Sequence, residues 1–203
     1  MANGRICTGY SKPYVAKYSA SGSTVTYTEP TALARGVSVS ISPETSDNNV
    51  FYADNVAAET EAGTFTGGTA TITVDGLKDE AAELVHGLPE PSTITVGASN
   101  TVNIMEYGDN ANPPYLGFGC LVRYMEDGVA SWVPVVLTKV RFDTSALDAA
   151  TQEENIDWQT QELTAQIFRD DSTNHNWKKI AAAQTSEAAA ETVLKVMLGG
   201  TAA

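Results

Sequence analysis

Alternating apolar and polar residues dominate the first two-thirds of the chain. Val37, Val39 and Ile41 alternate with serines, and a run of apolar residues from Ala70 to Val74 alternates with threonines. Successive side chains of a strand point to opposite faces, so each run predicts a strand with one apolar face. We expect further strands over 13–18, 24–28, 93–96, 102–105, 115–125, 131–142 and 163–167.

Turn-forming residues join four of these predicted strands into two hairpins. Residues 19–23 predict a five-residue loop between the strands 13–18 and 24–28. Residues 126–128, with the sequence Glu-Asp-Gly, predict the turn of the second hairpin. Pro134 lies in the return strand of that hairpin, and because proline has no N–H it indicates a sheet edge or a bulge there.

The apolar period becomes helical after residue 76. Apolar residues from Leu77 to Leu88 recur three to four positions apart, which predicts an amphipathic helix over about 77–87. Gly87 and the prolines that follow it predict where this helix ends. His86 lies in its last turn, where a positive charge would interact favourably with the helix dipole, so we interpret this histidine as structural.

The remaining segments complete one mainly β domain. Residues 143–161 have no clear period and carry five acids, which predicts a long acidic loop or arm. Apolar residues at helical spacing predict a helical tail over 185–203. No linker divides residues 1–184, so we expect one sandwich-like β domain with a flanking helix, followed by an extended or helical C-terminal arm.

The net charge of the chain limits which classes of molecule it can bind. The chain has 25 acidic and 12 basic residues, a formal net charge of −13, and most of the excess acid follows residue 78. A DNA-binding surface or a polybasic membrane anchor needs clustered basic groups, so both are disfavoured. The sequence contains neither a stretch approaching about 20 apolar residues nor an N-terminal signal peptide, and we expect synthesis and assembly in a cytoplasm.

Candidate catalytic and metal-binding groups are sparse. Asp170, Asp171 and His175 form an Asp-Asp-x-x-x-His run, but the spacing is not that of a zinc or EF-hand site, which favours a solvated polar turn. Glu153 and Glu154 are adjacent carboxylates that point in opposite directions on an extended chain, so we expect a solvated or interfacial role. The sequence therefore predicts no enzyme, no cofactor and no bound metal.

Two further features are interpreted as structural. The sequence Gly117-Phe118-Gly119-Cys120 opens a predicted strand rather than a helix, so it is not a phosphate-binding loop. Cys7 and Cys120 are the only cysteines, and we expect both to be reduced thiols. Strands rich in serine, threonine and valine have weakly protected edges, which favours pairing with other copies into a ring or a tube.

Several short motifs occur in a characteristic order along the chain. They are Gly9–Tyr18, Phe51–Asn55, Phe65–Gly68, Val74–Leu77, Pro113–Gly119 and Ala150–Gln161. In their order, their spacing and the chain length, they resemble the major tail proteins, or tail tube proteins, of long-tailed, non-contractile phages and prophages. The resemblance covers roughly residues 5–185.

This resemblance implies a fold, an assembly and a set of partners. The family fold is a β-sandwich with a flanking helix, and six copies form a ring that stacks into a tube within the virion tail. Loops and terminal arms reach between subunits and between rings. The implied partners are other copies, a tape-measure protein, a tail-tip initiator and a tail terminator, and genomic DNA passes through the acidic lumen without specific binding.

The same resemblance suggests which residues carry this role. Phe51, Tyr52 and Trp158 are candidate contacts between subunits, since aromatic residues dominate interface energetics, although burial in the core of the subunit is an open alternative. Glu162, on a predicted strand, is the candidate acid facing the lumen. The other candidate contacts are Asp54, Glu153 and Glu154.

Two alternative functions remain open. One is a tube protein of a contractile tail or a secretion-type system, which would share the fold and be distinguished by a neighbouring sheath gene. The other is a receptor- or carbohydrate-binding β-sandwich of the tail, which would require an exposed aromatic cluster. The three tryptophans are scattered along the sequence, which argues against this second alternative.

Overall fold

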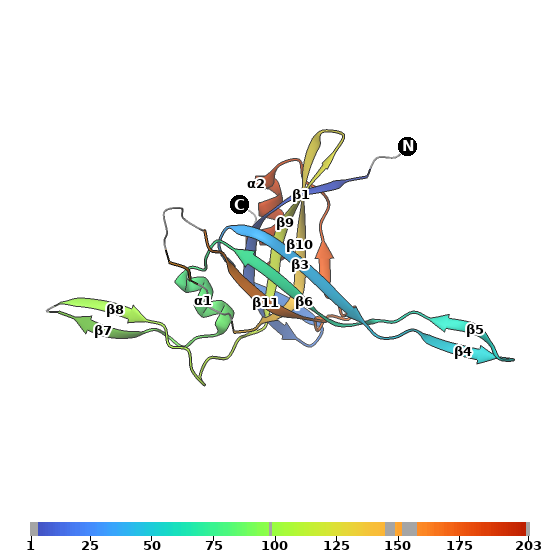
Figure 1. The fold of residues 1–203 in the computed structure, drawn as a ribbon, viewed down its shortest axis with the longest axis horizontal. Helices are drawn as coiled ribbons and strands as arrows, with labels where there is room; N and C mark the ends of the chain where they lie inside the picture. The colour runs from blue at the N-terminus through green and yellow to red at the C-terminus, as the bar shows by residue number, and fades with distance from the viewer. Residues whose placement is uncertain (1–3, 98, 145–148, 152–157, 202–203) are drawn as a thin grey trace.

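One large antiparallel sheet organises the molecule (Figure 1). The computed structural model describes residues 4–97, 99–144, 149–151 and 158–201. Seven strands follow the order β2-β1-β9-β10-β11-β6-β3, and a short eighth strand, β12, pairs with β10. These strands are β1 (Ile6–Ser21), β2 (Thr24–Ala32), β3 (Gly36–Thr45), β6 (Phe65–Val74), β9 (Leu116–Glu126), β10 (Val129–Phe142), β11 (Gln161–Phe168) and β12 (Lys178–Ile180). The prediction of a mainly β, sandwich-like fold is confirmed.

The large sheet curls around the main hydrophobic core. The Leu33 N–H donates to the Pro13 carbonyl at 3.0 Å, and Gly36 lies directly against the Tyr10 ring, which brings the start of β3 back towards β1. Val15, Ile72, Phe118, Leu137 and Leu163 are among the fully buried side chains inside this curve.

Helix α1 (Asp79–His86) packs on the main core through Ala81 and Val85, close to the predicted range. Gly87 ends the helix with a φ of 58°, and a Cβ there would lie 2.0 Å from the Asn112 carbonyl oxygen, so both backbone conformation and space require glycine. His86 is buried, and this burial lowers its pKa. The residue interpreted as structural thus lies in the interior, where burial favours the neutral imidazole over the cation that the helix dipole would favour.

Helix α2 (Glu187–Met197) packs on the opposite face of the sheet from the main core. A Cβ on Gly119 would lie 2.6 Å from the Leu194 Cδ1, and a Cβ on Gly117 would lie 2.6 Å from a carbon of the Tyr27 ring. The two glycines therefore let α2 and Tyr27 approach the backbone of β9. As a result, the residues of β9 from Leu116 to Leu121 are buried on both faces of the sheet.

The hairpin turns differ in how well the sequence predicted them. The turn between β9 and β10 is confirmed, with φ values of 48° at Asp127 and 81° at Gly128. The predicted five-residue loop between β1 and β2 is wrong, because Ser21 pairs with Thr24 and leaves only two turn residues. Gly22, with a φ of 58°, supplies the left-handed conformation that such a tight turn needs.

Pro134 lies neither at an edge of the sheet nor at a bulge in its pairing with β9, so that prediction is wrong. Strand β10 pairs with β9 without interruption from Val129 to Leu137. The Pro134 carbonyl accepts from the Ala181 N–H at 3.0 Å, so the nitrogen of Pro134 faces the same way, towards the irregular segment after β12. A missing donor is tolerated there because that segment does not form a regular ladder.

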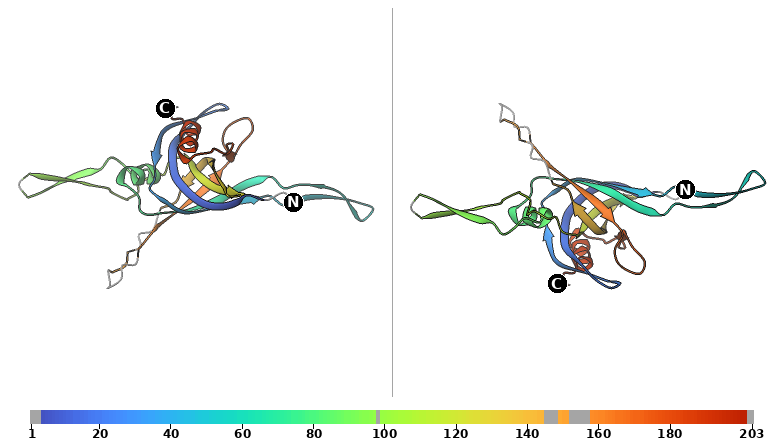
Figure 2. Two further views of the ribbon diagram at one scale, coloured as in Figure 1. Left: turned by 90° about the horizontal axis from the view of Figure 1, so that it is seen from above. Right: turned by 90° about the horizontal axis from the view of Figure 1, so that it is seen from below.

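Two long hairpins project from opposite ends of the molecule (Figures 1 and 2). The β4–β5 arm contains β4 (Asn49–Ala53) and β5 (Val56–Glu61), and the β7–β8 arm contains β7 (Ser92–Val96) and β8 (Asn100–Ile104). The strands of the β7–β8 arm match the predicted ones. We refer to the large sheet with its two helices as the body.

Candidate assembly surfaces

The β4–β5 arm exposes aromatic side chains on both of its faces. Phe51 and Tyr52 are each 64% exposed, and as neighbours in a strand they point to opposite faces. Asp54 and Asn55 form the tip, with φ values of 49° and 63° that give the twisted turn typical of tight hairpins. The structure thus places Phe51 and Tyr52 outside the core of the subunit.

The β4–β5 arm is also strongly acidic. Residues 46–64 contain four carboxylates and no basic residue, and the nearest basic residues in sequence are Arg35 and Lys78. Two of the acids, Glu59 and Glu61, lie on β5, where every side chain is exposed. The four acids are Asp47, Asp54, Glu59 and Glu61.

The β7–β8 arm has no charged residue between positions 92 and 104. The register pairs Ile94 with Val102 and Val96 with Asn100, so Ile94, Val96 and Val102 share one face. These three side chains are 48%, 51% and 41% exposed. The other face carries polar residues, namely Thr93, Thr95, Thr101 and Asn103. This arm is therefore neutral and amphipathic, with its apolar face open to solvent.

A third surface consists of hydroxyl-bearing rows across β3, β6 and β11. The register aligns Ser38 with Thr73 and Glu162, and the two following rows are built in the same way. Those rows are Ser40, Thr71 and Thr164, and Ser42, Thr69 and Gln166. Leu163, Ala165 and Ile167 alternate with the row positions of β11 and are buried, so the rows lie on the outer face. Glu162 is the one carboxylate within these three rows, and the Asp143 carboxylate accepts from Gln166 at their edge.

The predicted contact residues do not gather in one patch. Phe51, Tyr52 and Asp54 share the β4–β5 arm, whereas Trp158 precedes β11 and is 82% exposed. Glu153 and Glu154 lie outside the described residues. Sequence reasoning did not identify the apolar face of the β7–β8 arm as a surface, although the alternation of Ile94, Val96 and Val102 with threonines was a usable signal.

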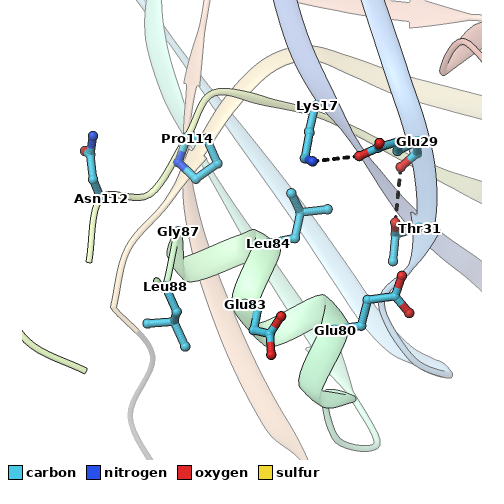
Figure 3. Close-up of a pocket in the computed structure, with 10 residues that line it drawn as sticks. All are labelled: Lys17, Glu29, Thr31, Glu80, Glu83, Leu84, Gly87, Leu88, Asn112 and Pro114. Atoms are coloured by element: carbon cyan, nitrogen blue, oxygen red, sulfur yellow. Dashed lines mark hydrogen bonds and ion pairs between the residues drawn. The ribbon is translucent and has the colours of Figure 1, made fainter. Parts of the chain in front are cut away.

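A cavity of about 390 Å³ lies beside α1 (Figure 3). An ion pair between Lys17 and Glu29, 2.6 Å apart, forms one side of the cavity, and Glu80 and Glu83 of α1 line another. With three carboxylates and one ammonium group in its lining, the cavity disfavours an anionic ligand.

Glu191 ties α2 to the sheet. Its carboxylate accepts from the Tyr14 hydroxyl at 2.7 Å and pairs with Lys12 at 3.0 Å and with Lys195 at 2.9 Å. Burial by itself would raise the pKa of Glu191, but the hydrogen bonds from Lys195, Tyr14 and Lys12 outweigh it and lower the pKa to about 2. Glu187 adds a contact to the same strand, accepting from the Ser11 hydroxyl at 2.6 Å.

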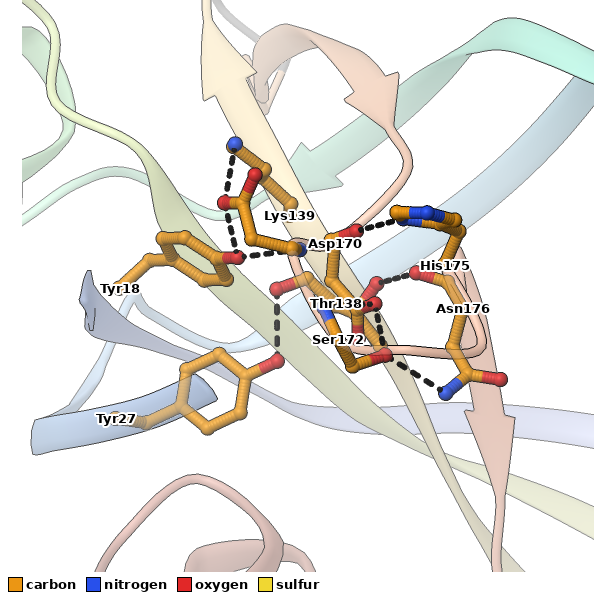
Figure 4. A network of polar contacts seen from close by, with 9 residues as sticks. Tyr18, Tyr27, Thr138, Lys139, Asp170, Ser172, His175 and Asn176 are labelled. Carbon is orange, nitrogen blue, oxygen red and sulfur yellow. Dashed lines mark hydrogen bonds and ion pairs between the residues drawn. The ribbon is translucent and has the colours of Figure 1, made fainter. Parts of the chain in front are cut away.

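The acidic run after β11 forms a hydrogen-bonded turn (Figure 4), in which Asp171 and His175 are exposed, as expected of a solvated polar turn, whereas Asp170 is buried. Asp170 is buried and accepts from both the backbone and the hydroxyl of Ser172. The Nδ1 of His175 lies 3.1 Å from the Asp170 carbonyl oxygen, and Asn176 donates to the Ser172 hydroxyl. These contacts fold the loop on itself. Among the described residues, no group of three or more His, Cys, Asp or Glu side chains is arranged so that it could hold a metal ion.

Asp171 connects this loop to Tyr18 and Lys139 of the body, two residues labelled in Figure 4. Its carboxylate accepts from Lys139 at 2.8 Å and from the Tyr18 hydroxyl at 2.6 Å, and the hydrogen bond from Lys139 is the main reason why the pKa of Asp171 is lowered. The Lys139 ammonium also lies 4.6 Å from the centre of the Tyr115 ring. The Lys139 ammonium group therefore already has interaction partners within the subunit.

No protein-family model matches the chain, and no curated protein matches it. Among the residues that the structure describes, no helix is long and apolar enough to cross a membrane.

Proposed function

We propose that this chain is a structural virion protein, the major tail protein of a long-tailed, non-contractile phage or prophage. In this role, copies assemble into stacked hexameric rings that form the tail tube, an acidic conduit for the genome. The observation that carries the proposal is the pair of arms, which project in opposite directions and leave apolar side chains in solvent.

Arms of this kind are expected to have low stability in a protein that functions as a monomer. A two-stranded ribbon has little stability in water unless other elements cover it, and both arms consist of two strands with mostly exposed side chains. Neighbouring copies in a ring or in stacked rings would cover the arms. This requirement favours a self-assembling protein over a monomeric enzyme or binding module.

The edges of the large sheet support the same proposal. Strands β2 and β3 end the seven-stranded order, so each has one side without a partner strand in that sheet. β3 alternates valine and serine from Val37 to Ser40 and has no lysine to block an approaching strand. Pairing of such edges between copies would extend the sheet around a ring.

The hydroxyl face is the surface best suited to the inside of the tube. Its three rows contain serine, threonine and glutamine side chains, with Glu162 as their one charged group. Phosphates are held mainly by lysine and arginine; the three rows contain neither, and Arg141 of β10 follows Gln166 at one edge of the face. A wall of this composition stays hydrated and lets DNA slide past, so in this proposal Glu162 faces the lumen.

The two alternative functions account for fewer of these surfaces. A tube protein of a contractile tail or secretion-type system would need the same arms and edges, and a neighbouring sheath gene would identify it. A carbohydrate-binding role would need a flat aromatic platform, whereas Phe51 and Tyr52 point to opposite faces of the arm. Self-assembly into a tube therefore accounts for more of the molecule.

Electron microscopy tests the proposal directly. We expect the purified protein, alone or seeded with a tail-tip initiator, to form rings or tubes with six subunits per turn. A reconstruction would also show on which side of the wall Glu162 lies. A protein that stays strictly monomeric by light scattering at every concentration, even when seeded, would contradict the proposed function.

A further inference from the structure

The two arms differ most in charge. The β4–β5 arm carries four carboxylates over residues 46–64 and no basic group, whereas the β7–β8 arm carries no charge over residues 92–104. Both arms nevertheless leave apolar side chains exposed, so both need a covering partner. Charge therefore limits which arm can cover which.

Like arms make poor partners for one another. Two β4–β5 arms brought together would place eight carboxylates in one contact, and like charges at an interface are strongly unfavourable. Two β7–β8 arms would join a pair of copies about a twofold axis and would leave both β4–β5 arms uncovered. Only a contact between unlike arms covers both surfaces without opposing like charges.

The directions of the arms fit a contact between unlike arms. Because the arms project from opposite ends of the body, a contact between the β7–β8 arm of one copy and the β4–β5 arm of the next repeats head to tail (Figure 2). Ile94, Val96 and Val102 supply a continuous apolar face. On the other arm, Phe51 is 64% exposed and pairs with Glu59, and it supplies an aromatic side chain that this face can cover.

We propose that the apolar face of the β7–β8 arm packs on the face of the β4–β5 arm of the neighbouring copy that carries Phe51. This inference rests on the proposed self-assembly and adds which surfaces meet. Thr93, Thr95 and Thr101 lie on the other face of the β7–β8 arm and stay hydrated in this contact. The acidic arm thus finds a neutral partner instead of a repelling one.

Charge substitutions within the apolar face of the neutral arm test this pairing. Val102→Glu places an acid against the acidic arm, and we expect it to raise the concentration needed for assembly about tenfold. Val102→Lys is the matched control: it removes the same apolar side chain but adds a cation that the carboxylates of the acidic arm attract, so we expect a smaller loss. Adding Glu59→Lys, at the position paired with Phe51, to Val102→Glu should restore assembly. Equal losses with Glu and Lys, or no rescue, would overturn the proposed pairing.

Cross-linking tests the contact independently of the assembled shape. Val102→Cys and Phe51→Cys are made separately in a Cys7→Ser background, since Cys7 is exposed while Cys120 is buried. We expect disulfide-linked dimers only when the two variants are mixed and oxidised. Dimers formed by either variant alone, or rings and tubes without mixed dimers, would overturn the arm pairing while leaving the tube proposal intact.

The remaining outcomes separate the two proposals. Mixed dimers that form chains or sheets but never tubes would support the arm pairing and contradict the tail-tube function. An original protein that stays monomeric under all conditions would contradict both.

Discussion

The body and the arms contain the same kind of alternating strand but differ in whether its apolar face is buried. In the body, Ala70, Ile72 and Val74 of β6 are fully buried, because the curled sheet and α1 enclose them. In the arms, residues such as Phe51 and Ile94 lie in two-stranded ribbons without a second layer and remain in solvent. Alternation therefore specifies a strand and its faces, while burial depends on whether another element is available to cover the face.

The largest expected effect comes from truncating a phenylalanine in the body, for comparison with Phe51 in the β4–β5 arm. Phe118 is 1% exposed in the main core, and Phe118→Ala should lower the free energy of unfolding by about 3–5 kcal/mol. Urea unfolding of the unassembled protein, followed by circular dichroism, measures this loss.

Phe51→Ala is the matched substitution in an arm. Its effect on the unfolding of the unassembled protein should stay within about 0.5 kcal/mol, because the side chain packs on little within the subunit. Destabilisation by Phe51→Ala close to that of Phe118→Ala would remove the contrast between body and arms.

An intermediate effect is expected where α2 approaches the sheet. Gly119→Ala places a methyl group within 2.6 Å of the Leu194 Cδ1 and should cost about 1–3 kcal/mol, because α2 must move outward. Faster hydrogen exchange in residues 187–197 would report this movement. Gly108→Ala is the control, since no atom lies near that position, and it should leave the exchange of α2 unchanged.

A smaller loss than that of Gly119→Ala is expected for the ion pairs of α2, and it depends on pH. The pKa of Glu191 is about 2 in the folded protein, below its ordinary value of 4.5, so its contribution is present above about pH 4.5 and is lost as pH falls towards 2. Glu191→Gln should therefore reduce stability by about 1 kcal/mol near neutral pH and by progressively less below pH 4.5. A loss that does not change with pH would show that charge on Glu191 is not the cause.

The sequence predicted those features of the fold that local residues determine. Asp127 and Gly128 form the expected turn because both tolerate the left-handed backbone, and the stripe from Leu77 to Leu88 marks the site of α1. Gly117 and Gly119 were seen as a motif, but Gly119 makes room for Leu194 of α2, about 70 positions further along the chain, and Gly117 makes room for Tyr27, 90 positions earlier. Tertiary packing of this kind leaves no periodic pattern in the sequence.

The candidate site was predictable only in part. Glu162 was placed on a strand correctly because Leu163, Ala165 and Ile167 alternate, and this alternation also puts Glu162 on the outer face. The strands of the β4–β5 arm were missed, since the run from Val50 to Ala53 is continuously apolar or aromatic and has no distinct face.

The pairing of β1 with β9 has a consequence for how the protein is synthesised. The hydrogen bond from the Thr8 hydroxyl to the Arg123 carbonyl joins residues 115 positions apart, and both arms lie between β1 and β9 in the sequence. During translation, each arm therefore leaves the ribosome before the strand that completes the centre of the sheet. Contacts between such distant segments form slowly, so neighbouring nascent chains on one messenger RNA expose their arms while their bodies are still open. Spacing between ribosomes thus becomes a control on premature association.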